Sequence, residues 1–200
     1  MIIGQGLVHI DPEKLSAIKE WHPPSSVKGV HTFLGFANFY CKFIPKYSNI
    51  IAPIVLLTCK DHPWSWTTPQ QLAFDSLCSI FSSTPILCIS DVSCPFSLMM
   101  DASLLVASTV LMQPDTTGDL HPCAYFSKTF SAAEQNYDIY DHKLLAIILA
   151  LAEWKQYLQG TPHHVSVLTN HKNLLYLKDP HKLSCHQACW SLFLQDFDIV

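Results

Sequence analysis

Two strand ends in this sequence carry polar side chains of a kind that could do chemistry. Residues 165–177, VSVLTNHKNLLYL, read as a short buried strand that ends at Thr169, Asn170 and His171 before an apolar helix or turn. Asp101 likewise closes an apolar run, in FSLMMDAS. Many α/β enzymes place functional groups at such strand ends. Asn170 is neutral, so its strand end is either no active site or one that has lost its carboxylate.

A second candidate for chemistry is the stretch CHQAC, in which Cys185, His186 and Cys189 bring two thiols and an imidazole together. No second pair of ligands accompanies it at the spacing of a zinc finger. The eight cysteines are scattered along the chain, several of them inside apolar segments, where a reduced thiol packs as a small hydrophobe. The sequence therefore favours reduced cysteines and disfavours a metal site at CHQAC.

The charge of the chain excludes a general attraction to nucleic acid. Twelve lysines and no arginine stand against 16 acidic residues, which gives a net charge of -4. Binding to a phosphate backbone would depend on a local lysine patch, because the chain has no arginine, whose guanidinium can donate two hydrogen bonds to one phosphate. The longest apolar run, residues 144–152, is too short to cross a bilayer, and the N-terminus lacks a signal-peptide pattern. These features predict an intracellular protein, cytoplasmic or nuclear, without a membrane partner.

The first 60 residues read as the end of a hairpin followed by helices. Residues 1–10 are typical of a β-hairpin with Gly4 and Gly6 at its turn. Helices are expected from Pro12, from a cap at Ser25 or Ser26, and over residues 47–58. A boundary rich in turn residues follows at 59–69, and then another helix runs through QQLAFDSLCSIF.

Beyond residue 95 the pattern predicts an α/β domain. Strands are expected at residues 96–103, 107–113 and 121–129 and form an antiparallel meander. A long helix is expected from about residue 132 to 158, and a fourth strand at 165–169. Further segments are a short helix at 174–177, a helix in HQACWSLFLQDF and the start of a fifth strand at 198–200. This order indicates a mixed sheet with flanking helices.

Six stretches of the chain resemble, in order, the gypsy-type LTR retrotransposon reverse transcriptases. They are DPEKLSAIKEW, FLGFANFYCKFI, WSWTTPQQLAFDSL, MMDAS, YFSKTFSAAEQNYDIYDHKLLAIILALAEWKQYL and LTNHKNLLYL. The resemblance implies the end of a palm and a helical thumb-like segment over residues 1–60. It implies a ribonuclease H-like domain, truncated at its last strand, over residues 61–200. The catalytic palm would precede residue 1, so the resemblance implies no DNA synthesis by this chain.

The resemblance also implies a metal-dependent nuclease site. Enzymes of this family hydrolyse the RNA strand of RNA/DNA hybrids with two Mg²⁺ ions held by clustered carboxylates. Asp101 matches the first of these carboxylates and is the expected catalytic and metal-binding residue. The family's glutamate on the long helix falls at Lys143, in DHKLLAI, and its next aspartate falls at Asn170. Two of the three carboxylates within this chain are therefore replaced, one of them by a cation.

These replacements predict that hydrolysis is lost and that no Mg²⁺ binds, because Asp101 alone is insufficient. Asp141 and Asp138 lie about 200° and 140° round the helix from Lys143, so neither occupies its face. Lys143 is expected to point toward the sheet and to form an ion pair with Asp101. Two alternatives stay open. One is a ribonuclease H with residual activity, and the other is a module co-opted to bind nucleic acid or protein with the same fold.

Contacts with nucleic acid are expected at Gln135, Asn136 and Tyr137, which precede the long helix in a region that approaches the hybrid in the family. Asn136 is equally suited to cap that helix. Binding of the hybrid is expected to be weak or lost. The truncated last strand would leave an unpaired sheet edge, which predicts self-association. The aromatic stripe on the second helix is expected to be core rather than a surface for bases, and it comprises Phe33, Phe36, Phe39 and Tyr40.

Overall fold

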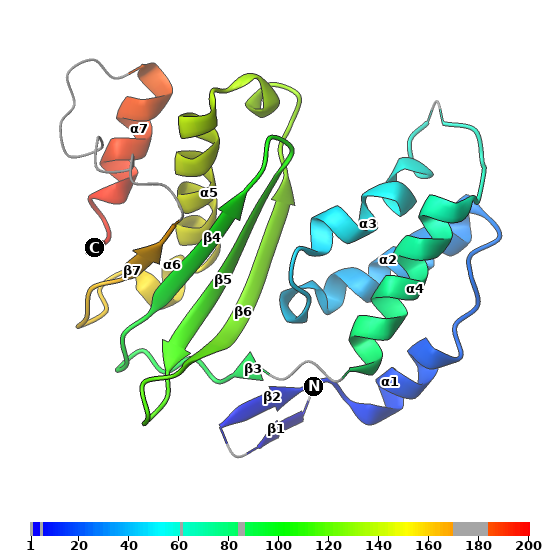
Figure 1. Ribbon diagram of the computed structural model, residues 1–200, viewed down its shortest axis with the longest axis horizontal. Helices are drawn as coiled ribbons and strands as arrows, with labels where there is room; N and C mark the ends of the chain where they lie inside the picture. The colour runs from blue at the N-terminus through cyan, green and yellow to red at the C-terminus, as the bar shows by residue number, and fades with distance from the viewer. Residues whose placement is uncertain (1, 5, 61, 84–86, 170–183) are drawn as a thin grey trace. The chain divides into compact units, whose positions relative to one another are not determined.

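The computed structural model describes residues 2–4, 6–60, 62–83, 87–169 and 184–200. The chain forms two compact units, Met1–Ile89 and Ser90–Val200, whose elements are labelled in Figure 1. Each unit has a sheet and helices of its own. No helix among the described residues is both long and apolar enough to span a membrane.

The first unit begins with the predicted hairpin. β1 (Ile2–Gly4) pairs antiparallel with β2 (Leu7–His9), and Gly6 lies between them at φ +77°, a left-handed conformation that suits glycine. A third strand, β3 (Leu87–Cys88), pairs antiparallel with β2. The sequence did not predict β3, because two residues are too few to show the alternation of a strand.

The helices of the first unit enclose an aromatic core. They are α1 (Pro12–Lys19), α2 (Val27–Phe39), α3 (Tyr47–Leu56) and α4 (Thr68–Ser82), with a 3₁₀ turn, η1, at Cys41–Phe43. Of the two expected caps of α2, Ser26 is the one used: its hydroxyl accepts a hydrogen bond from the Gly29 amide at 3.2 Å.

The aromatic stripe of α2 lies mostly in that core. Phe33 is 0% exposed, and its ring centroid lies 5.7 Å from that of Trp21 and 4.9 Å from that of Phe74. Tyr40 is also buried. The interpretation of the stripe as core is confirmed for these residues, whereas Phe39 is 61% exposed.

Helix α4 packs within the first unit, against α3 and α1. The buried Gln70 donates from Nε2 to the carbonyl of Pro53 at 3.1 Å, which fastens α4 to α3. The two compact units divide after Ile89. The domain boundary near residue 60 stays a prediction. The turn residues at 59–69 link two helices of one unit, because the apolar face of α4 completes the core around Phe33.

The second unit is built on a mixed sheet. β4 (Ser97–Ala102), β5 (Val106–Pro114) and β6 (Leu120–Thr129) form the predicted antiparallel meander, and β7 (Ser166–Leu168) runs parallel to β4, so the order is β6-β5-β4-β7. Val165 forms a parallel bridge with Ile199, which agrees with the predicted start of a fifth strand. The expected mixed α/β fold is confirmed. Self-association through a sheet edge stays a prediction.

The single long helix expected over residues 132–158 is instead divided. A 3₁₀ turn, η2 (Glu134–Asn136), comes first, then α5 (Ile139–Glu153) and α6 (Lys155–Leu158). The side chain of Asp138 accepts hydrogen bonds from the amides of Tyr140 and Asp141, both at 2.9 Å. The prediction of one continuous helix was wrong because Asp138 is a strong N-cap, which begins a new helix at Ile139.

The core of the second unit lies between the sheet and α5, which packs on β4 and β5. Leu98 and Leu111 face each other across these strands and are fully buried. Phe126 of β6 meets Trp154 at the end of α5 with ring centroids 6.2 Å apart. Helix α7 (Cys185–Leu194), expected in HQACWSLFLQDF, packs against α5 (Figure 1). The short helix expected at 174–177 lies outside the described residues.

Candidate functional site

Asp101 lies near the end of β4, on the exposed side of that strand. The side chains of β4 alternate: Leu98 and Met100 are buried, whereas Met99 and Asp101 are exposed. Across the sheet, the backbone of Asp101 is paired in register with Ser108 of β5. The carboxylate that the sequence identifies is therefore accessible to solvent.

Lys143 lies in the second turn of α5, in a buried part of the helix. Residues 141–147 are all buried, and Lys143 is 9% exposed. Among the described residues, the buried side-chain atoms that lack a hydrogen-bond partner are Thr109 Oγ1 and His142 Nδ1, and Lys143 Nζ is not among them. We infer that the stem of Lys143 is packed while its ammonium reaches water, as is usual for lysines at the edge of a core.

The ion pair expected between Lys143 and Asp101 is not formed within the described residues. The other described lysines of this unit do form ion pairs: Lys128 Nζ lies 3.9 Å from Glu134, and Lys155 Nζ lies 3.6 Å from Asp196. The two residues differ in burial, because Asp101 occupies an exposed position of β4 whereas Lys143 belongs to the buried stretch 141–147 of α5.

Asn170 and His171, the polar tip that follows the fourth strand, lie outside the described residues. The strand that leads to them is described. β7 runs parallel to β4, and Leu168 is paired in register with Met99. The strand of Asp101 and the strand that precedes Asn170 are therefore neighbours in the sheet, both running in the same direction.

Gln135, Asn136 and Tyr137, the candidate nucleic-acid contacts, are engaged in local structure. Gln135 Nε2 donates to the Phe130 carbonyl at 2.9 Å, and Asn136 Nδ2 donates to the Ala132 carbonyl at 3.0 Å. Asn136 does not cap α5, since Asp138 does; the alternative role considered for Asn136 was wrong. A contact of these three residues with nucleic acid stays a prediction.

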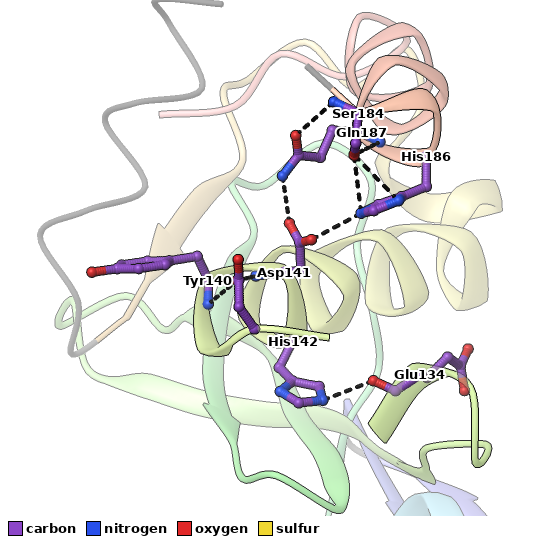
Figure 2. Close-up of polar contacts among 8 residues, drawn as sticks. Glu134, Tyr140, Asp141, His142, Ser184, His186 and Gln187 are labelled. Atoms are coloured by element: carbon purple, nitrogen blue, oxygen red, sulfur yellow. Dashed lines mark hydrogen bonds and ion pairs between the residues drawn. The ribbon is translucent and has the colours of Figure 1, made fainter. Parts of the chain in front are cut away.

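A polar cluster that the sequence did not predict joins α5 to α7 (Figure 2). Asp141 Oδ2 accepts a hydrogen bond from His186 Nε2 at 2.8 Å, and Asp141 Oδ1 accepts one from Gln187 Nε2 at 2.7 Å. The Ser184 hydroxyl caps α7 and lies 3.2 Å from both ring nitrogens of His186. Tyr137 stacks on the same imidazole, with centroids 4.9 Å apart. The histidine of CHQAC therefore holds one helix against another.

Replacement of Asp141 by alanine should loosen α7. Two hydrogen bonds to a largely buried carboxylate are lost, which should lower the free energy of unfolding by about 2 kcal/mol and speed amide exchange in α7. Thermal unfolding and hydrogen–deuterium exchange measure these effects. The matched control is Asp196→Ala, which removes an exposed ion pair with Lys155 and should change stability by about 0.5 kcal/mol or less. Equal effects of the two substitutions would contradict this prediction.

A second set of contacts fastens the segment between β6 and α5. His142 is buried against Phe130, with ring centroids 5.0 Å apart, and its Nε2 lies 2.8 Å from the carbonyl of Glu134 (Figure 2). The Ser131 amide donates to Glu134 Oε2 and lowers the pKa of that carboxyl, with a further contribution from the charge of Lys128. These contacts fix where α5 begins and hence where Lys143 lies.

Comparison with known proteins identifies the family. Residues 91–197 match the model of the RNase H-like domain found in reverse transcriptase. The chain belongs to this family. It is 35% identical over 188 residues to the Tf2-3 and Tf2-4 transposon polyproteins of Schizosaccharomyces pombe, a match that covers 93% of the chain. The chain spans only 14% of those polyproteins. The resemblance to a retrotransposon reverse transcriptase is thereby confirmed.

Solved structures agree with this RNase H-like assignment. The foamy viral protease-reverse transcriptase in complex with dsDNA superposes with a TM-score of 0.79 at 21% identity, covering 100% of this chain and 44% of the viral one. The same viral protein in complex with an RNA/DNA hybrid gives 0.73 at 22% identity, with 96% and 26% covered. At this level of identity the likeness establishes the fold.

Within the described part of this RNase H-like domain, the donor set does not fit a pair of Mg²⁺ ions. Mg²⁺ requires oxygen ligands in near-octahedral geometry. Of the two described positions that the resemblance assigns to family carboxylates, Asp101 supplies oxygens and Lys143 supplies an ammonium. The part of the chain that the structure describes contains no group of three or more His, Cys, Asp or Glu side chains placed to hold a metal ion. No hydrolytic step through a metal follows from these residues.

The residue pair that sequence reasoning missed in this RNase H-like domain is Asp141 with His186. They are 45 positions apart, and a single sequence gives no indication of which turns of α5 and α7 meet. One signal was present: Asp141 lies three residues before the apolar run 144–152, and a carboxylate that such a helix buries needs a hydrogen-bond donor. That requirement predicts a partner without naming His186.

Proposed function

We propose that this chain is a thumb-like segment and RNase H-like domain of a retrotransposon reverse transcriptase in which hydrolysis of RNA/DNA hybrids has been lost. The observation that carries the proposal is Lys143. Lys143, 9% exposed as a residue, lies on the helix that packs against the strand of Asp101. Its ammonium would stand where the resemblance implies the family's glutamate.

The electrostatic argument concerns the sign of the charge at that position. A glutamate attracts a divalent cation, and a lysine repels it, so the exchange reverses a Coulomb interaction worth several kcal/mol at contact distance and an effective dielectric constant of about 20. Asn170, if it stands where the family has an aspartate, removes a further negative charge. Asp101 alone is then insufficient to bind the ions that activate water.

The test is cleavage of a labelled RNA/DNA hybrid in Mg²⁺ or Mn²⁺, read on a denaturing gel. We expect no cleavage above a control without protein, and no difference between the wild type and Asp101→Ala. Cleavage by the wild type that disappears in Asp101→Ala would establish a residual ribonuclease H and overturn the proposal.

Binding of the hybrid is proposed to be weak. The foamy viral protease-reverse transcriptase, part of which shares this fold, forms a complex with an RNA/DNA hybrid, which supports the proposal that a hybrid could be bound at all. The charge of this chain opposes binding, because a protein with a net charge of -4 and no arginine has little general attraction to a phosphate backbone.

A further inference from the structure

We propose that Cys185 and Cys189 of α7 form a two-thiolate site that holds one soft monovalent cation, Cu(I), in linear coordination. The site uses neither Asp101 nor Lys143, so it does not depend on the proposed loss of hydrolysis. Both ligands belong to one helix, and that helix alone sets the distance between them.

The two thiols are exposed on the same side of α7. Three cysteines of the chain are exposed, Cys59, Cys185 and Cys189, and the last two lie four residues apart in one helix. Residues four apart in an α-helix are neighbours on its surface, with Cβ atoms about 5–6 Å from each other. Both thiols are therefore accessible to the same ion from solvent.

The spacing of these thiols suits a bridging ion better than a disulfide. A disulfide requires Cβ atoms about 3.5–4.5 Å apart, which is closer than two positions on successive turns of a helix. A linear S–metal–S unit spans about 4.6 Å between its sulfurs if each bond is about 2.3 Å long, as in zinc thiolates. Rotation about the two χ1 angles brings the Sγ atoms to that separation without unwinding α7.

The ligands determine the class of ion. Thiolates are soft ligands, which favour Cu(I) and Zn²⁺ over Mg²⁺. Zn²⁺ takes three or four protein ligands, and the described parts of the chain hold no group of three or more His, Cys, Asp or Glu side chains placed for a metal. His186 lies between the two cysteines in sequence, but its Nε2 is hydrogen-bonded to Asp141. Two sulfurs alone suit an ion that accepts linear coordination.

The electrostatics of α7 also favour the complex. Two thiolates and one Cu(I) carry one net negative charge, because each thiol releases its proton when the metal binds. Cys185 is the first residue of α7, where the helix N-terminus has a partial positive charge. The sequence of α7, CHQACWSLFL, contains no charged residue that would oppose the anionic complex.

The experiment is a competition for Cu(I) between the reduced protein and the coloured chelator bicinchoninate, without oxygen and at one equivalent of Cu(I) per chain. Loss of the chelate colour measures transfer of the ion to the protein. Wild-type protein should take up the ion. Cys185→Ser and Cys189→Ser should each bind it at least about hundredfold more weakly, because the second thiolate must then come from another molecule. The matched control Cys59→Ser removes the other exposed thiol and should leave the affinity unchanged.

A second control keeps the number of thiols and changes their spacing. In Cys189→Ser/Ser191→Cys the second thiol lies six residues from Cys185, about 9 Å along the helix and about 240° round it, so one ion cannot join the two. This variant should bind Cu(I) as weakly as Cys189→Ser does. Because Cys185 and Cys189 are exposed, their replacement should not change the thermal unfolding of the metal-free protein. Cys185→Ala and Cys189→Ala take the place of a serine variant that unfolds early.

Several results would overturn the proposal. They are wild-type protein that leaves Cu(I) on the chelator, a variant at Cys185 or Cys189 that binds as tightly as the wild type, and an equal loss of affinity in Cys59→Ser. Elution of the copper-loaded wild type as a dimer in size-exclusion chromatography would also overturn it, because the ion would then join thiols of two chains.

Discussion

The double variant Lys143→Glu/Asn170→Asp should have a divalent-cation site. Neither of the two single substitutions should create such a site. The double variant would carry three carboxylates, counting Asp101, where the wild type has one. With Asn170→Asp alone, the ammonium of Lys143 still repels a divalent cation. With Lys143→Glu alone, the neutral amide of Asn170 still stands in place of the third carboxylate, so one negative charge is missing.

Titration with Mn²⁺, followed by electron paramagnetic resonance, measures this effect. We expect the double variant to bind Mn²⁺ at least about tenfold more tightly than the wild type, because two charges next to the ion have changed in its favour. The control carries the same change of charge elsewhere in the unit, Lys155→Glu with Asn136→Asp. An equal gain in that control, or a full gain from Asn170→Asp alone, would show that position 143 does not decide metal binding.

Replacement of Phe33 by alanine should cost the first unit about 3–5 kcal/mol of unfolding free energy. Phe33 is 0% exposed and joins the rings of Trp21 and Phe74, which come from different segments of the unit. Truncation leaves a cavity that a close-packed core cannot fill, and it removes two aromatic contacts at once. The measurement is urea-induced unfolding followed by tryptophan fluorescence.

The control for Phe33 lies on the same helix. Phe39 is 61% exposed, so Phe39→Ala removes an aromatic side chain from α2 without opening a cavity and should change the stability by about 0.5 kcal/mol or less. Comparable losses at the two positions would mean that helix propensity, rather than burial in the core, sets the effect of Phe33.

Local patterns predicted the meander well and the start of α5 poorly. β4, β5 and β6 lie within one or two residues of their expected bounds, because the turns between them are short and contain Ser103 or Gly118. The helix expected to begin at residue 132 begins at Ile139 because Asp138 caps it. A periodic pattern shows that a helix exists, but its first residue depends on which side chain captures the free amides.

The sequence did not predict the contacts between residues that lie far apart in the chain. The single sequence singled out Asp101 and Lys143 through the order of the motifs, but the ion pair that it predicted between them is not formed among the described residues. It did not reveal that Asp141 holds His186, or that Gln70 fastens α4 to α3. Each of these contacts depends on how two helices are rotated against each other, and spacing along one helix does not determine that.

The small strand β3 has a consequence for how the protein is made. It pairs with β2 through Leu87 opposite Val8 and Cys88 opposite Leu7, so the two ends of the first unit meet in one sheet. During synthesis, the hairpin at the N-terminus must wait until β3 has left the ribosome before this sheet can be completed. Because such a closure joins residues far apart in the chain, we expect it to be slow compared with the formation of the helices between them.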